Sequence, residues 1–201
     1  IILPPRSDFV IVKKLDEKSI CLLPKAPPVP EMDWVFPLFA YKDNHVRAII
    51  WELKYKENTR ALDIIGKLLY EEIISLLSDV VLFEKNAQFL LIPIPISPER
   101  RNSRGYNQSE YIAKAILEYD IDRTLLYAPQ WFQKIKDTGE QNKSTSKEER
   151  MKNLVGCFEA DPCVSGKYII LIDDVVTTGS TLAEARSTLL STSARHVFAF
   201  T

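Results

Sequence analysis

The stretch that most constrains this chain is YIILIDDVVTTGSTLAEA, residues 168–185. Its apolar start is typical of a strand that is buried on both faces of a parallel sheet. Two adjacent carboxylates, Asp173 and Asp174, end the apolar run, and a hydroxyl-rich turn leads into a helical pattern. The stretch therefore predicts a strand–turn–helix unit, which is the building block of an α/β fold.

The remaining chain repeats this alternation of apolar runs and helical periodicity. We expect helices over residues 45–58, 60–80, 107–119 and 180–191, and strands over residues 34–43, 90–96, 155–160, 168–174 and 195–201. Residues 124–136 predict a strand followed by a helix start or a second strand. These elements predict an α/β domain over residues 36–201, with a central, mostly parallel sheet flanked by helices on both faces. Residues 1–35 predict a small strand-rich appendage, with short strands at 8–15 and 18–24.

Composition excludes several classes of protein. The 201 residues carry a net charge of −1, so no overall positive field attracts nucleic acid or an anionic membrane. No apolar run is long enough to span a bilayer. The three cysteines form no C-x-x-C pair, and scattered cysteines favour the cytoplasm, where thiols stay reduced. The first residue is not methionine, which we take as a sign that residues are missing upstream.

The end of the predicted strand at 168–174 carries groups suited to a sugar phosphate. A helix start offers unpaired N–H groups to an anion, and Gly179 allows the backbone to approach it closely. Asp173 and Asp174 would repel that anion, so they suit sugar hydroxyls or a divalent cation. We interpret the stretch as a cradle for ribose 5-phosphate. Either half alone would be better explained as helix capping and an ordinary turn.

A second candidate segment, IPIPISPERRNSRGYNQ, follows the predicted strand at 90–96. It places Ser97, Arg100, Arg101 and Arg104 in a basic loop before a helix that starts at Asn107 or Gln108. Such a loop suits a pyrophosphate group, although alone it is better explained as a solvated loop with Asn107 as helix cap. The chain has neither a G-x-x-x-x-G-K-[ST] phosphate loop nor a glycine-rich dinucleotide fingerprint.

The stretch IILIDDVVTTGSTL resembles the 5-phosphoribosyl-1-pyrophosphate (PRPP) signature of type I phosphoribosyltransferases. The resemblance implies that fold and implies that Asp173 and Asp174 contact the ribose hydroxyls, with Mg²⁺ at the same carboxylates. It also implies a loop that binds the 5-phosphate, which consists of Val175, Val176, Thr177, Thr178, Gly179, Ser180 and Thr181. The cofactor implied is Mg²⁺ bound together with PRPP.

The stretch SPERRNSRGYNQSEYIAKAI resembles the hallmark of the ComF, or competence-type, branch of these proteins. The residues that match its pattern are Arg100, Arg104, Gly105, Tyr106, Asn107 and Gln108. Two other segments resemble the family, and they contribute Lys54 from the first and Thr138, Gln141, Arg150 and Asn153 from a mobile loop. The polar residues near Ser144 depart from the family pattern. The cysteine-rich zinc ribbon of the family is missing from these residues, so we expect no zinc here.

The resemblance implies transfer of a phosphoribosyl group to a nitrogen acceptor with release of pyrophosphate. The polar segment 137–150 would close over the site and exclude water. The alternative is a non-catalytic PRPP or nucleotide sensor that works in natural transformation. Candidate partners are DNA-uptake proteins, single-stranded DNA and a second copy of the chain, but no membrane. The segment RGYNQ argues against a purine-salvage enzyme, and nothing in the sequence names the acceptor.

Overall fold

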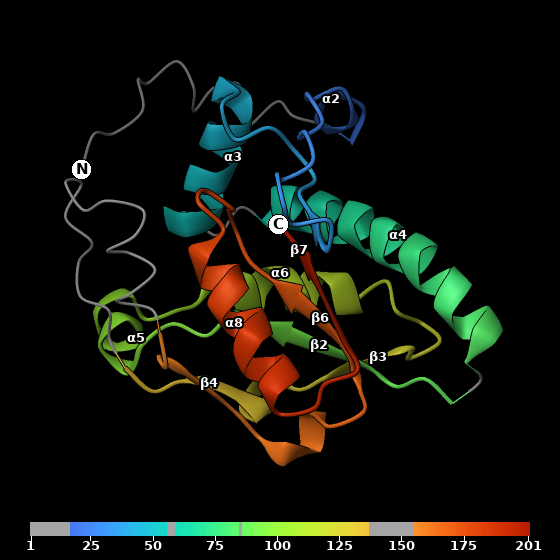
Figure 1. Cartoon of the computed structure of the whole chain (residues 1–201). Coiled ribbons are helices and arrows are strands. Elements are labelled where there is room, and N and C mark those ends of the chain that lie inside the picture. Colours follow the sequence, from blue (N-terminus) through green and yellow to red (C-terminus); the bar gives the residue numbers. More distant parts are fainter. Residues whose placement is uncertain (1–16, 56–58, 85, 137–154) are drawn as a thin grey trace.

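A computed structural model describes residues 17–55, 59–84, 86–136 and 155–201 (Figure 1). In chain order, the first three described helices are α2 (Glu17–Cys21), α3 (Asn44–Tyr55) and α4 (Thr59–Phe83). They are followed by α5 (Pro98–Arg104), α6 (Gln108–Leu117) and α8 (Ser180–Ser191), and by two 3₁₀ turns, η1 (Pro129–Trp131) and η2 (Pro162–Val164). The strands are β1 (Val35–Phe36), β2 (Phe89–Pro93), β3 (Leu125–Tyr127), β4 (Phe132–Lys134), β5 (Phe158–Ala160), β6 (Tyr168–Ile172) and β7 (His196–Phe200).

Five strands form one sheet in the order β1-β7-β6-β2-β3, and every neighbouring pair is parallel. Parallel neighbours need crossover connections, and helices α6 and α8 follow β2 and β6 as such connections. The expected architecture, a parallel sheet flanked by helices, is therefore confirmed. Strand β6 lies at the centre of the sheet, so the acid pair that follows it emerges in the middle of one sheet edge.

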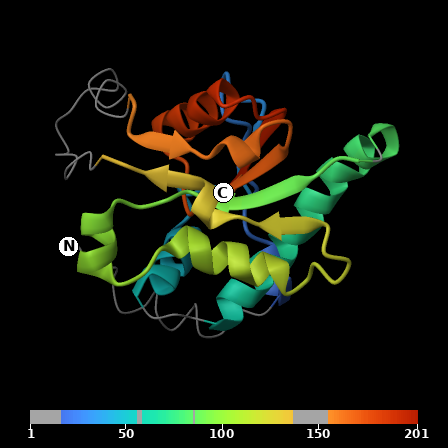
Figure 2. The same cartoon turned by 90° about the horizontal axis from the view of Figure 1, so that it is seen from below.

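The sheet has helices on both faces, as Figures 1 and 2 show. Helices α4 and α6 cover one face, and α8 covers the other together with the antiparallel pair β4 and β5. Alternate residues of β6 divide between the two cores, because successive side chains of a strand point to opposite faces. Ile170 belongs to the core beneath α4 and α6, whereas Ile169 and Leu171 belong to the core beneath α8.

Most of the predicted elements are confirmed, and four predictions were wrong in whole or in part. The strand expected at 34–43 is confined to the two residues Val35–Phe36. Residues 18–24 were expected to be a strand, but Glu17–Cys21 is helix α2. Strand β2 ends at Pro93 and does not continue to Ile96. The Ile94 N–H still donates to the Ile172 carbonyl (2.8 Å), but Pro95 has no N–H with which to extend the ladder. The expected basic loop is helix α5, which begins at Pro98 and ends at Arg104, with Gly105 as its C-cap.

The N-terminal part of the chain packs against the sheet domain where it is described. Ile20 of α2 is fully buried in the core beneath α4 and α6, and Lys25 pairs with Phe39 in an isolated antiparallel bridge. The division into an appendage at 1–35 and a domain at 36–201 stays a prediction. The strand expected at 8–15 lies outside the described residues. None of the described helices combines the length and apolar character that a bilayer crossing requires.

Candidate functional site

Asp173 and Asp174 follow the central strand β6, and neighbouring elements hold Asp173 in place. The Asp173 N–H donates to the Phe200 carbonyl over 3.1 Å, so the pairing with β7 continues past the end of β6. Asp173 Oδ1 accepts from the Ser109 hydroxyl (3.2 Å) and from the Asp174 N–H (2.9 Å). Both acids are half-buried. These contacts fix the carboxylate of Asp173. Both acids lie at the carboxyl end of the central strand.

The start of helix α6 brings Ser109 to Asp173. Asn107 is 2 % exposed; its Nδ2 donates to the Ile94 carbonyl (3.0 Å), and its Oδ1 accepts from the Ser109 N–H (3.1 Å). The helix start expected at Asn107 or Gln108 is confirmed. Asn107 thus ties α6 to the end of β2 and sets the position of Ser109. Ser109 was not among the predicted site residues, although its place directly after RGYNQ was a usable signal.

The hydroxyl-rich turn between β6 and α8 adopts the conformation that its glycine allows. Gly179 has a φ of +73°, in the left-handed region, and it precedes the first residue of α8. The hydroxyls of Thr178 and Ser180 lie 2.9 Å apart, and Thr177 is exposed. A Cβ on Gly179 would lie 2.5 Å from the sulfur of Met32, so the segment before β1 touches this turn. The predicted strand–turn–helix unit is confirmed in shape.

The basic segment 97–105 is a short capped helix. Ser97 is fully buried and caps α5 by accepting from the Arg100 N–H (3.3 Å). Arg101 forms an ion pair with Glu110 of α6, while Arg100 is half-exposed. The side chain of Arg104 lies outside the described residues. Because β2 pairs directly with β6, the segment that carries α5 leaves the sheet beside the acid pair.

One tyrosine lies close to the contact between α5 and α6. Burial raises the pKa of Tyr127 above its ordinary value of 10.0, the nearby Glu110 raises it further, and Arg101 lowers it. Tyr127 therefore stays protonated at neutral pH.

Other predicted residues are placed only in part. Lys54 belongs to α3, but its side chain lies outside the described residues. Thr138, Gln141, Arg150 and Asn153 all lie in the segment 137–154, which the structure does not describe. Strands β4 and β5, which flank this segment, pair with each other in antiparallel register. Lys134 of β4 and Phe158 of β5 are therefore neighbours across this pair. The roles of Lys54 and of the predicted residues in segment 137–154 stay predictions.

The donor set at the strand end suits a hydrated magnesium ion. Among the described residues, no group of three or more histidine, cysteine, aspartate or glutamate side chains gathers as a metal site. Magnesium commonly binds one or two carboxylates, several waters and the phosphates of a substrate. Asp173 and Asp174 supply such a pair of carboxylates. These residues fit a magnesium ion that arrives with its phosphate ligand, and they do not form a closed protein cage.

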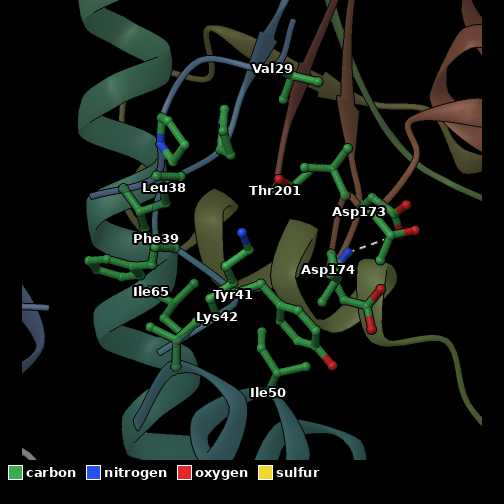
Figure 3. A pocket seen from close by; sticks show the side chains of 18 of the residues that line it. Val29, Leu38, Phe39, Tyr41, Lys42, Ile50, Ile65, Asp173, Asp174 and Thr201 are labelled. Carbon is green, nitrogen blue, oxygen red and sulfur yellow. Dashed lines mark hydrogen bonds between the residues drawn. The ribbon is translucent and has the colours of Figure 1, made fainter. Parts of the chain in front are cut away.

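A pocket of about 500 Å³ opens beside the acid pair (Figure 3). Asp173, Asp174 and Thr177 line one end of it. The remaining wall comes from the segments 26–30 and 37–42 and from helices α3, α4 and α6. A volume of this size lies within the range of about 300–1,000 Å³ that is usual for small-molecule sites. The residues of this wall were not predicted from the sequence, because they come from segments far apart in the chain.

No family model matches the chain. It is 26% identical over 154 residues to the DNA utilization protein YhgH of Salmonella typhimurium, which covers 74% of this chain and 63% of that protein. It is 35% identical over 102 residues to the competence protein ComFC of Bacillus subtilis, which covers 51% of this chain and 38% of that protein. The chain thus spans less than two thirds of these curated relatives.

Among solved structures, the chain is similar to a glutamine PRPP amidotransferase from B. subtilis in complex with ADP and GMP. The TM-score is 0.43 at 17% identity, and the match covers 75% of this chain and 30% of that one.

Proposed function

We propose that this chain, a ComF-type phosphoribosyltransferase-like protein, binds PRPP with magnesium and transfers the phosphoribosyl group to a nitrogen acceptor. The observation that carries the proposal is the position of the acid pair. Asp173 and Asp174 lie at the end of the central strand, between the turn that starts α8 and the arginine-bearing segment that follows β2. This arrangement suits a ligand with a sugar, a phosphate and a pyrophosphate.

Each part of PRPP has a chemical counterpart at this edge of the sheet. The carboxylates accept hydrogen bonds from the ribose hydroxyls, and Ser109 keeps Asp173 in position for them. The turn 177–181 and the first N–H groups of the twelve-residue helix α8 receive the 5-phosphate. We assign the pyrophosphate to Arg100 and Arg104. Arg101 contributes less, because its guanidinium already pairs with Glu110.

The reaction would break the bond between C1 of the ribose and pyrophosphate. Positive charge develops on the ribose ring as the leaving group departs, and the two carboxylates stabilise that charge. Magnesium, when bound, supplies positive charge that neutralises the departing pyrophosphate. The arginine side chains act in the same direction from the β2 side of the site. Asp173 and Asp174 therefore serve both in binding and in stabilising the transition state.

The proposal is tested by the double variant Asp173→Asn with Asp174→Asn. We expect calorimetry to detect PRPP binding to the unaltered chain in the presence of magnesium, and to detect none with the variant. Release of pyrophosphate in the presence of a suitable acceptor should be lost in parallel. The matched control is Glu118→Gln with Asp122→Asn, which removes two exposed carboxylates away from the site. Failure of the unaltered chain to bind PRPP would reject the proposal.

The second candidate is a non-catalytic PRPP or nucleotide sensor that acts with DNA-uptake proteins. It is favoured by the names of the relatives, which are a DNA utilization protein and a competence protein. PRPP binding without turnover across a panel of acceptors would support it. Binding of single-stranded DNA through α5 should weaken steeply as salt rises, and a flat salt response would count against that partner. The homodimer and the cytoplasmic location also remain predictions.

A further inference from the structure

The pocket beside the acid pair is lined mostly by apolar side chains. Val29, Leu38 and Phe39 line it from the segments around β1, Ile50 lines it from α3, and Ile65 lines it from α4. Figure 3 shows Phe39 and Ile65 across the pocket from Asp173 and Asp174. A ligand that reaches into this pocket therefore meets carboxylates at one end and hydrocarbon at the other.

The pocket lies on the side of the acid pair away from the arginine-bearing helix. Thr201, which follows β7, lines the pocket, whereas α5 follows β2. Strand β6 lies between β7 and β2 in the sheet. Although Ile112 of α6 also lines the pocket, most of its wall lies on the β7 side, so a nucleophile in the pocket and a pyrophosphate near α5 would lie on different sides of the acid pair. Such an arrangement suits a displacement at carbon, in which the nucleophile enters opposite the leaving group.

Apart from the acid pair and two threonines, the polar side chains of the pocket are few. Tyr41 and Lys42 line it, and Figure 3 shows both side chains between the apolar wall and the acid pair. Lys42 forms no ion pair with any residue in the part of the chain that the structure describes. A nucleobase would turn several hydrogen-bonding groups toward walls that cannot pair them, which costs binding free energy. An apolar ring with one anionic group matches the walls and Lys42.

We propose that this pocket binds the acceptor, and that the acceptor is an aromatic or heteroaromatic nitrogen compound that carries a carboxylate. The proposal rests on the proposed function. The nitrogen lone pair forms a bond to C1, and the bond from C1 to pyrophosphate breaks with its electron pair leaving on the pyrophosphate. The proton that the nitrogen loses passes to solvent. Lys42 pairs with the carboxylate, and the apolar walls hold the ring.

The test compares 2-aminobenzoate, its neutral analogue aniline, and adenine by calorimetry on the chain saturated with PRPP and magnesium. We expect 2-aminobenzoate to bind at least about tenfold more tightly than adenine, because adenine would leave its polar groups without hydrogen-bond partners in the pocket. Mass spectrometry should detect its N-phosphoribosyl product. Equal or tighter binding of adenine, or no binding of 2-aminobenzoate to a chain that binds PRPP, would overturn this proposal alone. Binding of 2-aminobenzoate without any PRPP binding would instead reject the proposed function.

Two variants separate the contribution of the Lys42 charge from that of the apolar pocket wall. Lys42→Gln should weaken 2-aminobenzoate binding about fivefold and leave aniline binding unchanged, as expected for one exposed ion pair. Ile50→Asn places an amide in the wall and should weaken both compounds at least about tenfold, while PRPP binding persists. The matched control is Leu82→Asn, which alters a 76 % exposed side chain at the end of α4. Equal effects of Leu82→Asn and Ile50→Asn would overturn the proposal.

Discussion

A single hydrogen-bonding side chain connects three elements at the candidate site. Asn107 joins the end of β2 to the start of α6, and through Ser109 it positions Asp173 after β6. Buried polar groups are costly when they lose their partners, so this cluster contributes to stability as well as to geometry. The Asp173 carboxylate, which we expect to hold the ribose, therefore depends on the side-chain amide of Asn107 through two successive hydrogen-bonding contacts.

The variant Asn107→Ala removes the helix cap and leaves the Ile94 carbonyl without its side-chain donor. We expect it to lower the free energy of unfolding by about 2 kcal/mol in urea titrations. Asn107→Asp keeps an acceptor for the Ser109 N–H, but it buries a charge and turns a second oxygen toward the Ile94 carbonyl, so it should destabilise the chain at least as much. The control Asn102→Ala alters an exposed residue of α5 and should stay within about 0.5 kcal/mol of the unaltered chain. Equal stability of Asn107→Ala and Asn102→Ala would contradict the role of this cap.

The three cysteines differ in their surroundings, which gives a prediction on pH. Cys157 is fully buried, and burial raises the pKa of its thiol above the ordinary 9.0. Cys21 and Cys163 are exposed. We expect a colorimetric thiol reagent at pH 8 to label Cys157 only after unfolding. Because its pKa is raised in the folded state, the stability it contributes is present below pH 9.0 and is lost as pH rises through the folded value.

The labelling result has an internal check. Cys163→Ser should reduce the number of thiols labelled in the folded chain by one, whereas Cys157→Ala should leave that number unchanged. Rapid labelling of Cys157 in the folded chain would show that the β4–β5 side of the core opens readily.

At the scale of elements, one glycine determines how closely two helices pack. A Cβ on Gly66 of α4 would lie 2.7 Å from the Cβ and carbonyl carbon of Ala115 in α6. Most helix positions favour alanine over glycine by about 1 kcal/mol, so this glycine is explained by the close approach of α4 and α6. The two helices together cover the face of the sheet next to the pocket.

We expect Gly66→Ala to destabilise the chain by about 2 kcal/mol, because backbone atoms of α6 would have to move. The control Ser75→Ala, at an exposed position of the same helix, should be neutral or stabilising by a few tenths of a kcal/mol (about 0.3). The measurement is thermal or urea unfolding followed by far-ultraviolet circular dichroism. A stabilising effect of Gly66→Ala would mean that the helices are not in such close contact.

At the scale of the whole molecule, the sheet connects two cores that lie on its opposite faces. Ile169 and Ile170 are adjacent in β6, both are fully buried, and each contributes to a different core. Because both cores share the same strands, loss of packing on one face should loosen the other. The edge of this sheet also carries the candidate site, which therefore depends on both cores.

The matched variants Ile169→Ala and Ile170→Ala test this dependence. We expect each to lower the free energy of unfolding by about 2–5 kcal/mol, the usual cost of a large-to-small change in a core. Tryptophan fluorescence and circular dichroism should report the same single transition in both. Two separate transitions in either variant would show that the faces unfold independently.

The sequence alone determined the order of the main elements, because that information is local. The apolar run before Asp173 and Asp174, the turn at Gly179 and the periodic pattern after it all lie within one short window. The helix at Pro98–Arg104 was not predicted from the sequence, although Ser97, Pro98 and Gly105 are suitable capping residues. We expected a loop there because seven residues are too few to show a clear helical period.

Tertiary structure alone decided what lies around the acid pair. The contact from Ser109 to Asp173 joins residues 64 positions apart, and the apolar pocket collects side chains from segments that no local pattern connects. Such juxtapositions depend on the order β1-β7-β6-β2-β3, in which neighbours in space are distant in the chain. Local patterns specify which face of an element is apolar, but only the packed sheet determines which elements share an edge.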